Sequence, residues 1–178
     1  LGLFKKFVIA DALALVALND TNATQVASTF WMWVIVYAYA FQIYFDFSGY
    51  TDIARGTSRL FGIELIRNFR QPYLSRNITE FWRTWHISLS NWLHDYLYVP
   101  LGGNRNGALS TYRNLMLTML IGGLWHGASW TFVVWGGLHG LYLVAERAIG
   151  VSEHRGVRPP IRAGQLPSKL FTFALVSM

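Results

Sequence analysis

Five histidines, nine carboxylates and no cysteine set the chemistry that this chain can perform. One of them, His126, lies within an uncharged apolar run from Leu115 to Ala145, LMLTMLIGGLWHGASWTFVVWGGLHGLYLVA. An ionisable residue in such a run is a functional candidate, because burying it costs free energy that an apolar residue avoids. Burial also disfavours the charged imidazole, so we predict that His126 is a neutral general base. The alternative is a structural histidine, held to a neighbouring helix by one hydrogen bond.

Three other ionisable residues are weaker candidates. His86 flanks the polar stripe of a predicted amphipathic helix, where histidines are more often structural than catalytic. Asp46 lies among aromatic residues in QIYFDFSGY, and we expect it to cap a helix or to form an ion pair. In a continuous helix, His139 would lie on nearly the opposite face from His126, thirteen residues earlier.

The apolar run that contains His126 is too long for one simple span and has a weak centre. At about 1.5 Å per residue it exceeds a hydrocarbon core of roughly 30 Å. Its centre holds glycine and serine residues around Trp125 and His126. Basic residues flank both ends, among them Arg105, Arg113, Arg147, Arg155, Arg158, Arg162 and Lys169. Because basic flanks favour the cytoplasmic face, the pattern predicts a re-entrant or kinked hairpin; the alternative is one long tilted helix.

Three elements are expected before residue 77. Residues 7–18 predict a short helix that ends at the turn-prone sequence NDTN, Asn19–Asn22. The uncharged segment from Thr21 to Phe45 predicts a membrane-spanning helix. The connector from Arg55 to Arg76 carries five arginines against one glutamate, and Pro72 prevents a long helix there. We therefore expect this connector to be cytoplasmic.

An amphipathic helix is predicted from Asn77 to Pro100. Asn77 and Glu80 have the spacing of a capping box. One helix face gathers apolar residues at spacings of three and four: Phe81, Trp85, Leu89, Trp92 and Tyr96. The following GGNRNG, Gly102–Gly107, lacks the preceding strand of a phosphate-binding loop and is expected to be a turn.

The composition favours an all-α integral membrane protein. Of 178 residues, 53% are hydrophobic and only 13% are charged. The formal charge of +6 resides in connectors and does not form one face, so we expect no nucleic-acid partner. Without cysteine, a disulfide framework, a thiolate metal site and a cysteine nucleophile are excluded. Both ends look cut, and we expect the chain to be the middle of a longer protein.

Several motifs together resemble the membrane-bound O-acyltransferase (MBOAT) family, and most closely its bacterial alginate O-acetyltransferase branch. The resemblance covers most of residues 1–150 and is carried by QIYFDFSGYTDIA, WHISLSNWLHDYLYVPLGGNR and GLWHG. It implies an all-α, multi-helix membrane bundle with re-entrant or interfacial helices. Residues 1–178 would then be the central part of a single transmembrane domain, truncated at both ends.

The same resemblance implies a site and a reaction. His126, in GLWHG, matches the family's catalytic histidine. His86 matches a second polar motif in which distant relatives carry asparagine, so it is expected to orient substrate. The implied reaction moves an acetyl group from an activated donor, such as a thioester co-substrate, to a hydroxyl of an exported polysaccharide such as alginate. No metal and no tightly bound cofactor are expected.

The implied setting is the bacterial inner membrane, in a multi-pass protein. The expected partners are the lipid bilayer, the acyl donor, the polysaccharide and other polysaccharide-modification proteins. Two alternatives use the same fold, namely D-alanyl transfer and peptidoglycan O-acyl transfer. A non-catalytic transport subunit and a structural subunit also remain, although the sequence shows no internal repeat of the kind that transporters carry.

Overall fold

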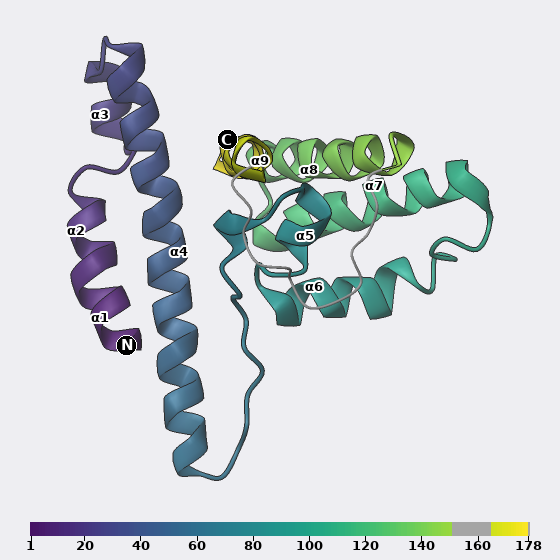
Figure 1. Cartoon of the computed structure of the whole chain (residues 1–178), viewed down its shortest axis with the longest axis horizontal. Helices are drawn as coiled ribbons and strands as arrows, with labels where there is room; N and C mark the ends of the chain where they lie inside the picture. The colour runs from purple at the N-terminus through teal and green to yellow at the C-terminus, as the bar shows by residue number, and fades with distance from the viewer. Residues whose placement is uncertain (151–164, 178) are drawn as a thin grey trace. The chain divides into compact units, whose positions relative to one another are not determined.

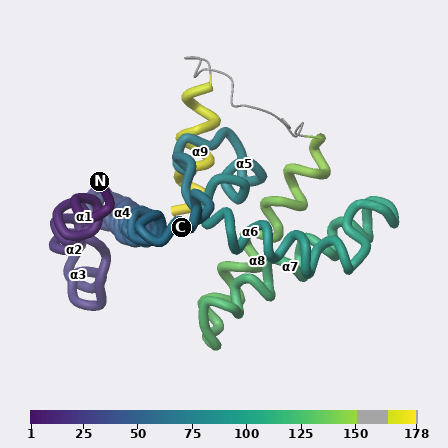
Figure 2. Tube along the Cα trace, turned by 90° about the horizontal axis from the view of Figure 1, so that it is seen from below, coloured from purple at the N-terminus to yellow at the C-terminus, as the bar shows by residue number. Residues whose placement is uncertain are grey.

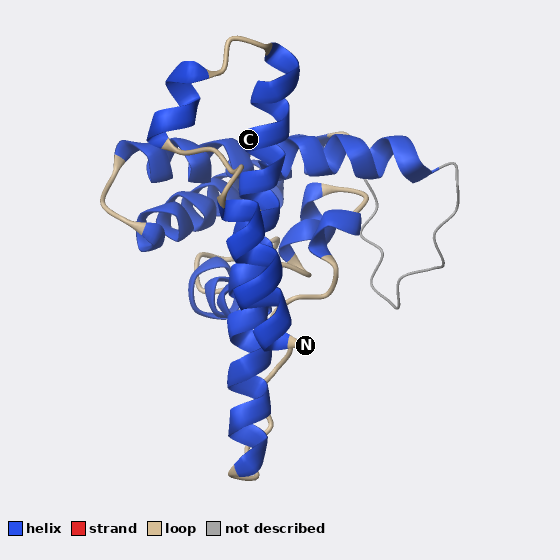
Figure 3. Cartoon of the chain, turned by 90° about the vertical axis from the view of Figure 1, so that its left-hand side faces the viewer, coloured by secondary structure: helices blue, strands red, loops and turns tan. Residues whose placement is uncertain are grey.

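The computed structural model describes residues 1–150 and 165–177, and within these residues all regular secondary structure is helical (Figure 3). This confirms the predicted all-α class for the described part of the chain. Two compact units are present: unit 1 comprises Leu1–Phe69 with Ser177, and unit 2 comprises Arg70–Val176. Arg155, Arg158 and Arg162, which the sequence places in the basic flank after the apolar run, lie outside the described residues.

Unit 1 is built on one long helix. Its elements are α1 (Gly2–Phe4), a π-helical segment (Lys5–Ala10), α2 (Asp11–Ala14), α3 (Asp20–Gln25) and α4 (Thr29–Leu60). The segment from α1 to α2 lies along α4, as Figures 1 and 2 both show. Glycines at Gly2 and Gly49 permit this close approach, because a Cβ atom on Gly49 would lie 2.9 Å from the Gly2 carbonyl oxygen.

Two ion pairs hold the N-terminal segment against α4. Lys5 Nζ lies 2.7 Å from an Asp52 carboxylate oxygen, and Lys6 Nζ lies 2.5 Å from Asp46 Oδ1. Asp46 therefore pairs with a lysine, which agrees with the structural role expected for it. Its carboxylate is half exposed, and the pair contributes little stability in such a setting.

The helix predicted over 21–45 has the wrong bounds. Asn19 instead caps α3, and its side chain accepts hydrogen bonds from the backbone amides of Thr21 and Asn22, so the predicted turn at 19–22 is also wrong. Helix α4 begins only at Thr29 and continues past Asp46 to Leu60. Asp46 lies within the helix and forms an ion pair with Lys6 from a neighbouring segment.

Across residues 1–150 and 165–177, no helix combines the length and the apolar character needed to cross a membrane. This finding contradicts the membrane-spanning helix predicted in unit 1. In α4, tryptophan and tyrosine residues and Gln42 interleave the aliphatic side chains and reduce the mean hydropathy of the helix.

Unit 2 contains the remaining elements. They are a 3₁₀ turn (Pro72–Leu74), α5 (Ile78–Trp82), α6 (Ile87–Leu93), a π-helical segment (His94–Tyr98), α7 (Gly107–His126), α8 (Trp130–Ala148) and α9 (Leu166–Ser177). The predicted turn at GGNRNG is confirmed: Gly102 has φ 104° and Gly107 has φ 84°. The buried Asn114 amide fixes this turn by donating to the carbonyls of Leu101 and Gly103, each at 3.1 Å.

The apolar run from Leu115 to Ala145 folds as a helical hairpin. Helix α7 ends at His126 and α8 begins at Trp130, where Ser129 caps it by accepting a hydrogen bond from the Thr131 amide. The predicted break near His126 is confirmed, and the alternative of one continuous helix is wrong. Whether the hairpin enters a membrane stays a prediction.

Candidate active site

Two glycines let the arms of the hairpin pack backbone against backbone. A Cβ atom on Gly123 of α7 would clash with the Phe132 carbonyl of α8, and one on Gly136 would clash with the Met119 carbonyl. Both glycines are buried. This close approach brings the side chains at the turn of the hairpin, including His126 and Trp135, against each other.

His126 lies at the last residue of α7, within a group of aromatic rings. Its ring centroid lies 5.3 Å from that of Trp135, edge to face, and 6.0 Å from that of Phe132. Trp125, the preceding residue, contacts it at 5.1 Å. The predicted burial is wrong for the described chain, since His126 is exposed. Helix α7 ends here, and the side chain therefore projects from the hairpin turn instead of from the middle of a helix.

His86 occupies the turn between α5 and α6. Its backbone is left-handed, with φ 42° and ψ 57°, a conformation that is uncommon for a residue with a side chain and is found often at functional sites. The imidazole contacts the Trp125 ring at a centroid distance of 6.1 Å, and its Nδ1 lies 3.3 Å from Ser88 Oγ. The turn thus brings His86 to the aromatic pair Trp125 and His126.

The two histidines are close enough to interact electrostatically. Burial lowers the pKa of His86 below its ordinary value, and the neighbouring His126 lowers this pKa further. A lowered pKa means that the His86 imidazole is neutral at pH 7 and offers one donor and one acceptor nitrogen. The structure therefore brings together the two histidines that the sequence singled out, although forty residues separate them.

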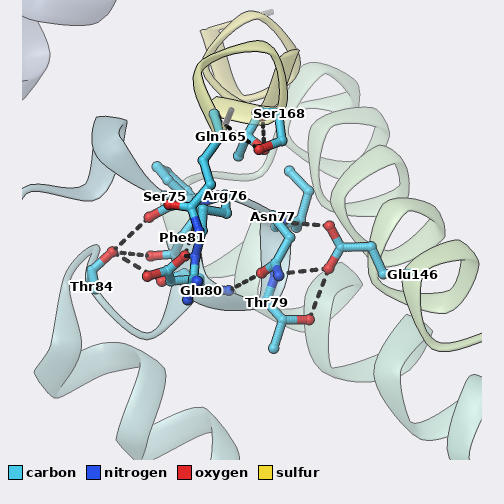
Figure 4. Close-up of polar contacts among 12 residues, drawn as sticks. Ser75, Arg76, Asn77, Thr79, Glu80, Phe81, Thr84, Glu146, Gln165 and Ser168 are labelled. Carbon is cyan, nitrogen blue, oxygen red and sulfur yellow. Dashed lines mark hydrogen bonds and ion pairs between the residues drawn. The ribbon is translucent and has the colours of Figure 1, made fainter. Parts of the chain in front are cut away.

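The single helix predicted from Asn77 to Pro100 is wrong, because it breaks after Trp82. The buried Thr84 side chain donates to the carbonyls of Glu80 and Phe81, both at 3.0 Å, and hydrogen bonds of this kind compete with the helical pattern (Figure 4). The break creates the turn that carries His86. The predicted cap at Asn77 is confirmed, since its side chain accepts from the Glu80 amide at 2.7 Å.

A carboxylate from α8 fixes the start of α5. Glu146 accepts hydrogen bonds from the backbone amides of Ile78, at 2.6 Å, and Thr79, at 3.0 Å, and also from the Thr79 hydroxyl (Figure 4). These amides are among the groups that a helix leaves unpaired at its N-terminus. Glu146 therefore ties α5, and through it the His86 turn, to the same hairpin that carries His126.

His139 lies next to the candidate site, although its spacing from His126 in the sequence did not indicate this. Because the run breaks between His126 and Trp130, α8 starts a new helical phase, and Trp135 contacts both His139 and His126. The His139 ring contacts Trp135 at 4.7 Å and Trp82 at 5.2 Å, and only 3% of the residue is exposed. The glycine and serine residues near 127 were the signal that could have revealed it.

His94 and the carboxylates do not join this group. His94 is exposed and lies 2.7 Å from Asp95 of the same turn. In the part of the chain that the structure describes, no three histidine, aspartate or glutamate side chains gather in a way that could hold a metal ion.

Comparison with known proteins identifies the family. The profile of the MBOAT, membrane-bound O-acyltransferase family, matches residues 1–152. The chain belongs to the membrane-bound O-acyltransferase family. His86, His126 and His139 all lie within the matched residues, and the family resemblance predicted from the motifs is confirmed. The roles predicted for His86 and His126 stay predictions.

Three relatives show how widely this MBOAT segment is shared. It is 53% identical to a probable alginate O-acetylase AlgI from Pseudomonas fluorescens, over 99% of this chain and 34% of the relative. It is 53% identical to a peptidoglycan O-acetyltransferase from Helicobacter pylori, over 83% of this chain and 28% of the relative. It is 33% identical to a teichoic acid D-alanyltransferase from Streptococcus thermophilus, over 83% of this chain and 38% of the relative. The MBOAT chain thus spans about a third of these relatives' length.

Proposed function

We propose that this chain carries the histidine site of a membrane O-acyltransferase that moves an acetyl group to a hydroxyl of an exported polysaccharide such as alginate. One observation carries the proposal: the turn at His86 and the end of α7 at His126 meet across the Trp125 ring. A general base beside a second, neutral histidine is an arrangement suited to activating a hydroxyl.

In the proposed reaction, His126 acts as general base. Its imidazole takes the proton of the acceptor hydroxyl while the oxygen forms a bond to the carbonyl carbon of an acyl thioester. The C–S bond then breaks, and the imidazolium returns the proton to the departing thiolate. Atoms and charges balance without a further reactant, and the product is an ester and a free thiol.

His86 is proposed to orient the reacting groups. The imidazole is neutral at pH 7, because burial and His126 both lower its pKa. A neutral imidazole carries one donor and one acceptor nitrogen, a combination suited to orienting a hydroxyl. Correct orientation of bound reactants lowers the barrier without any bond to His86 itself.

The identity of the acceptor has a specific alternative, because peptidoglycan could take the place of alginate. Relatives named for alginate and for peptidoglycan are both 53% identical to the chain, so identity alone does not separate the two acceptors. The relative named for D-alanyl transfer is more distant, at 33% identity. Alginate is proposed first, because five relatives with that name match between 85% and 99% of the chain. The proposed location is the bacterial inner membrane, with the bilayer and other polysaccharide-modification proteins as partners.

The test is an acyl-transfer assay on the full-length protein in detergent or liposomes. An acetyl donor is offered with alginate, a peptidoglycan fragment or teichoic acid, and the acetyl groups on each acceptor are counted by mass spectrometry. Acetylation of alginate by the wild type and not by the His126→Ala form supports the proposal. Transfer only to peptidoglycan would identify peptidoglycan, and not alginate, as the acceptor. Equal transfer by the wild type and the His126→Ala form would overturn the proposed role of His126.

A further inference from the structure

Two neighbouring side chains each leave a buried polar atom without a partner. Trp82 Nε1 and His139 Nδ1 are fully buried, and neither forms a hydrogen bond to any described residue. Their rings contact each other at a centroid distance of 5.2 Å and an angle of 80°. Buried polar groups are nearly always hydrogen-bonded, so two such atoms in one contact require an explanation.

Packing alone does not explain these two residues. His139 is enclosed by aromatic rings, with centroids at 6.3 Å for Phe81, 4.7 Å for Trp135 and 6.0 Å for Tyr142. A phenylalanine could fill such an aromatic environment without burying an unpaired nitrogen, which costs free energy. A polar ring in this position is therefore expected to meet a polar partner that the protein itself does not supply.

The two unpaired atoms have complementary hydrogen-bonding roles. The indole Nε1–H of Trp82 only donates, whereas Nδ1 of a neutral His139 accepts when the proton resides on Nε2. A hydroxyl group satisfies both at once, because its oxygen accepts and its proton is donated. We infer that Trp82 and His139 bind one hydroxyl group, with the indole donating to its oxygen and His139 Nδ1 accepting its proton.

A cavity in unit 2 borders one member of the pair, Trp82, whereas His139 is not among the residues that line it. The cavity has a volume of about 390 Å³, and Trp82 forms part of its wall. Other parts of the wall are polar, including Ser90, Asn91 and Thr118. Hydroxyl-bearing molecules fit a wall of this kind, where amides and alcohols alternate with an aromatic face.

The hydroxyl-binding pair lies one side chain away from the candidate base. Trp135 contacts His139 on one side and His126, at 5.3 Å, on the other. The hydroxyl belongs either to a water molecule or to an alcohol of the acceptor. In the second case the inference rests on the proposed function, and the pair is then a subsite that holds a hydroxyl other than the one that reacts.

The test observes the Trp82 indole directly in full-length protein labelled with ¹⁵N-indole tryptophan. The Trp82→Phe form assigns its NMR resonance, and Trp92→Phe assigns an exposed indole outside the site as a control. His139→Phe removes the acceptor nitrogen and keeps a ring, whereas His139→Asn restores a polar atom near the position of Nδ1. Spectra are recorded with and without an alginate oligosaccharide.

The inference predicts that the Trp82 indole proton has the chemical shift of a hydrogen-bonded proton. This resonance should move upfield in His139→Phe and move less in His139→Asn, while the Trp92 resonance stays unchanged. If the hydroxyl is water, this position is present without the oligosaccharide and shows exchange with water. If it belongs to the acceptor, the position appears only after the oligosaccharide is added. A wild-type Trp82 indole proton that is not hydrogen-bonded with or without the oligosaccharide overturns the inference. This measurement uses the wild-type protein, so it holds even if His139→Phe fails to fold.

The outcome is independent of the base chemistry. Acyl transfer that survives in His126→Gln would refute the proposed function without moving the Trp82 resonance. Conversely, an unbonded Trp82 indole beside a protein whose activity depends on His126 would refute only the hydroxyl-binding pair.

Discussion

At the scale of single residues, the strongest expectation concerns the basicity of His126. Glutamine has a similar size and keeps hydrogen-bonding atoms, but it cannot take a proton at neutral pH. His126→Gln in the full-length protein is therefore expected to lower the acyl-transfer rate by about 10²- to 10⁴-fold, the usual contribution of a general base. The His126 side chain is exposed, so replacing it with glutamine or alanine should not disturb the packing of the protein.

The control for this prediction is the amount of folded protein, measured by size-exclusion chromatography in detergent. His126→Ala should lose as much activity as His126→Gln, because both lack the base. Near-normal turnover in His126→Gln would show that this residue acts through shape or hydrogen bonding and not through proton transfer.

His86 makes a different prediction, because both its side chain and its backbone are constrained. Asparagine tolerates the left-handed region, whereas alanine there costs roughly 1–2 kcal/mol. His86→Asn should therefore keep measurable transfer activity, and His86→Ala should lose both activity and stability. His86→Gly separates the two effects, since it relieves the backbone while removing the side chain. Melting temperature and turnover, measured together on all three, test this; an inactive His86→Asn would assign His86 a direct chemical role.

At the scale of elements, the hairpin offers a matched pair of neighbouring glycines. A Cβ atom on Gly136 clashes with the Met119 carbonyl, whereas one on Gly137 lies 3.7 Å from Leu120 Cδ2, an ordinary contact. Gly136→Ala should thus lower the free energy of unfolding by about 1–3 kcal/mol and reduce activity by moving α8 away from α7. Gly137→Ala should be neutral or raise it by up to about 1 kcal/mol through helix propensity. Equal effects in thermal unfolding would contradict the hairpin packing.

The same hairpin shows what the sequence could predict. Glycine and serine around His126 weaken a helix, and this local signal correctly placed the break between α7 and α8. Its consequence for His139 was missed, because helical phase was carried through the break instead of being restarted at Trp130. With the phase restarted, the contact between Trp135 and His139, four residues apart on α8, follows from helix geometry.

The break in the helix predicted over Asn77–Pro100 could not be predicted in this way. The apolar residues of this segment keep helical spacing through the turn at His86. The contacts that favour the turn come from residues distant in the sequence. Glu146, 68 residues after Ile78, supplies the partner for the first amide of α5. Helix α4 likewise continues past Asp46, which pairs with Lys6 forty residues earlier, although the sequence predicted a boundary there. Such tertiary partners override local pattern and cannot be identified without the fold.

At the scale of the whole molecule, membership of the membrane-bound family and exposed apolar side chains favour association with lipid. Large hydrophobic residues are exposed on both units, including Leu15 at 87% and Trp130 at 82%. Exposed apolar patches of this kind mark binding or membrane surfaces. The full-length protein is therefore expected to stay in the membrane fraction during alkaline carbonate extraction. Recovery of a monodisperse protein without detergent would contradict this expectation.

The last prediction concerns the orientation of the connector from Arg55 to Arg76. Its five arginines against one glutamate favour the cytoplasmic face, and that glutamate, Glu64, lies 2.9 Å from Arg59 on the exposed surface. Ile66→Cys places a thiol at a position that is 54% exposed, in a segment without native cysteine. In intact cells this thiol should resist a membrane-impermeant maleimide and react with a permeant one, and cell lysis should remove the difference. The permeant reagent serves as the control for intrinsic reactivity. Rapid labelling by the impermeant reagent in intact cells would place the connector outside the cytoplasm and contradict the predicted orientation.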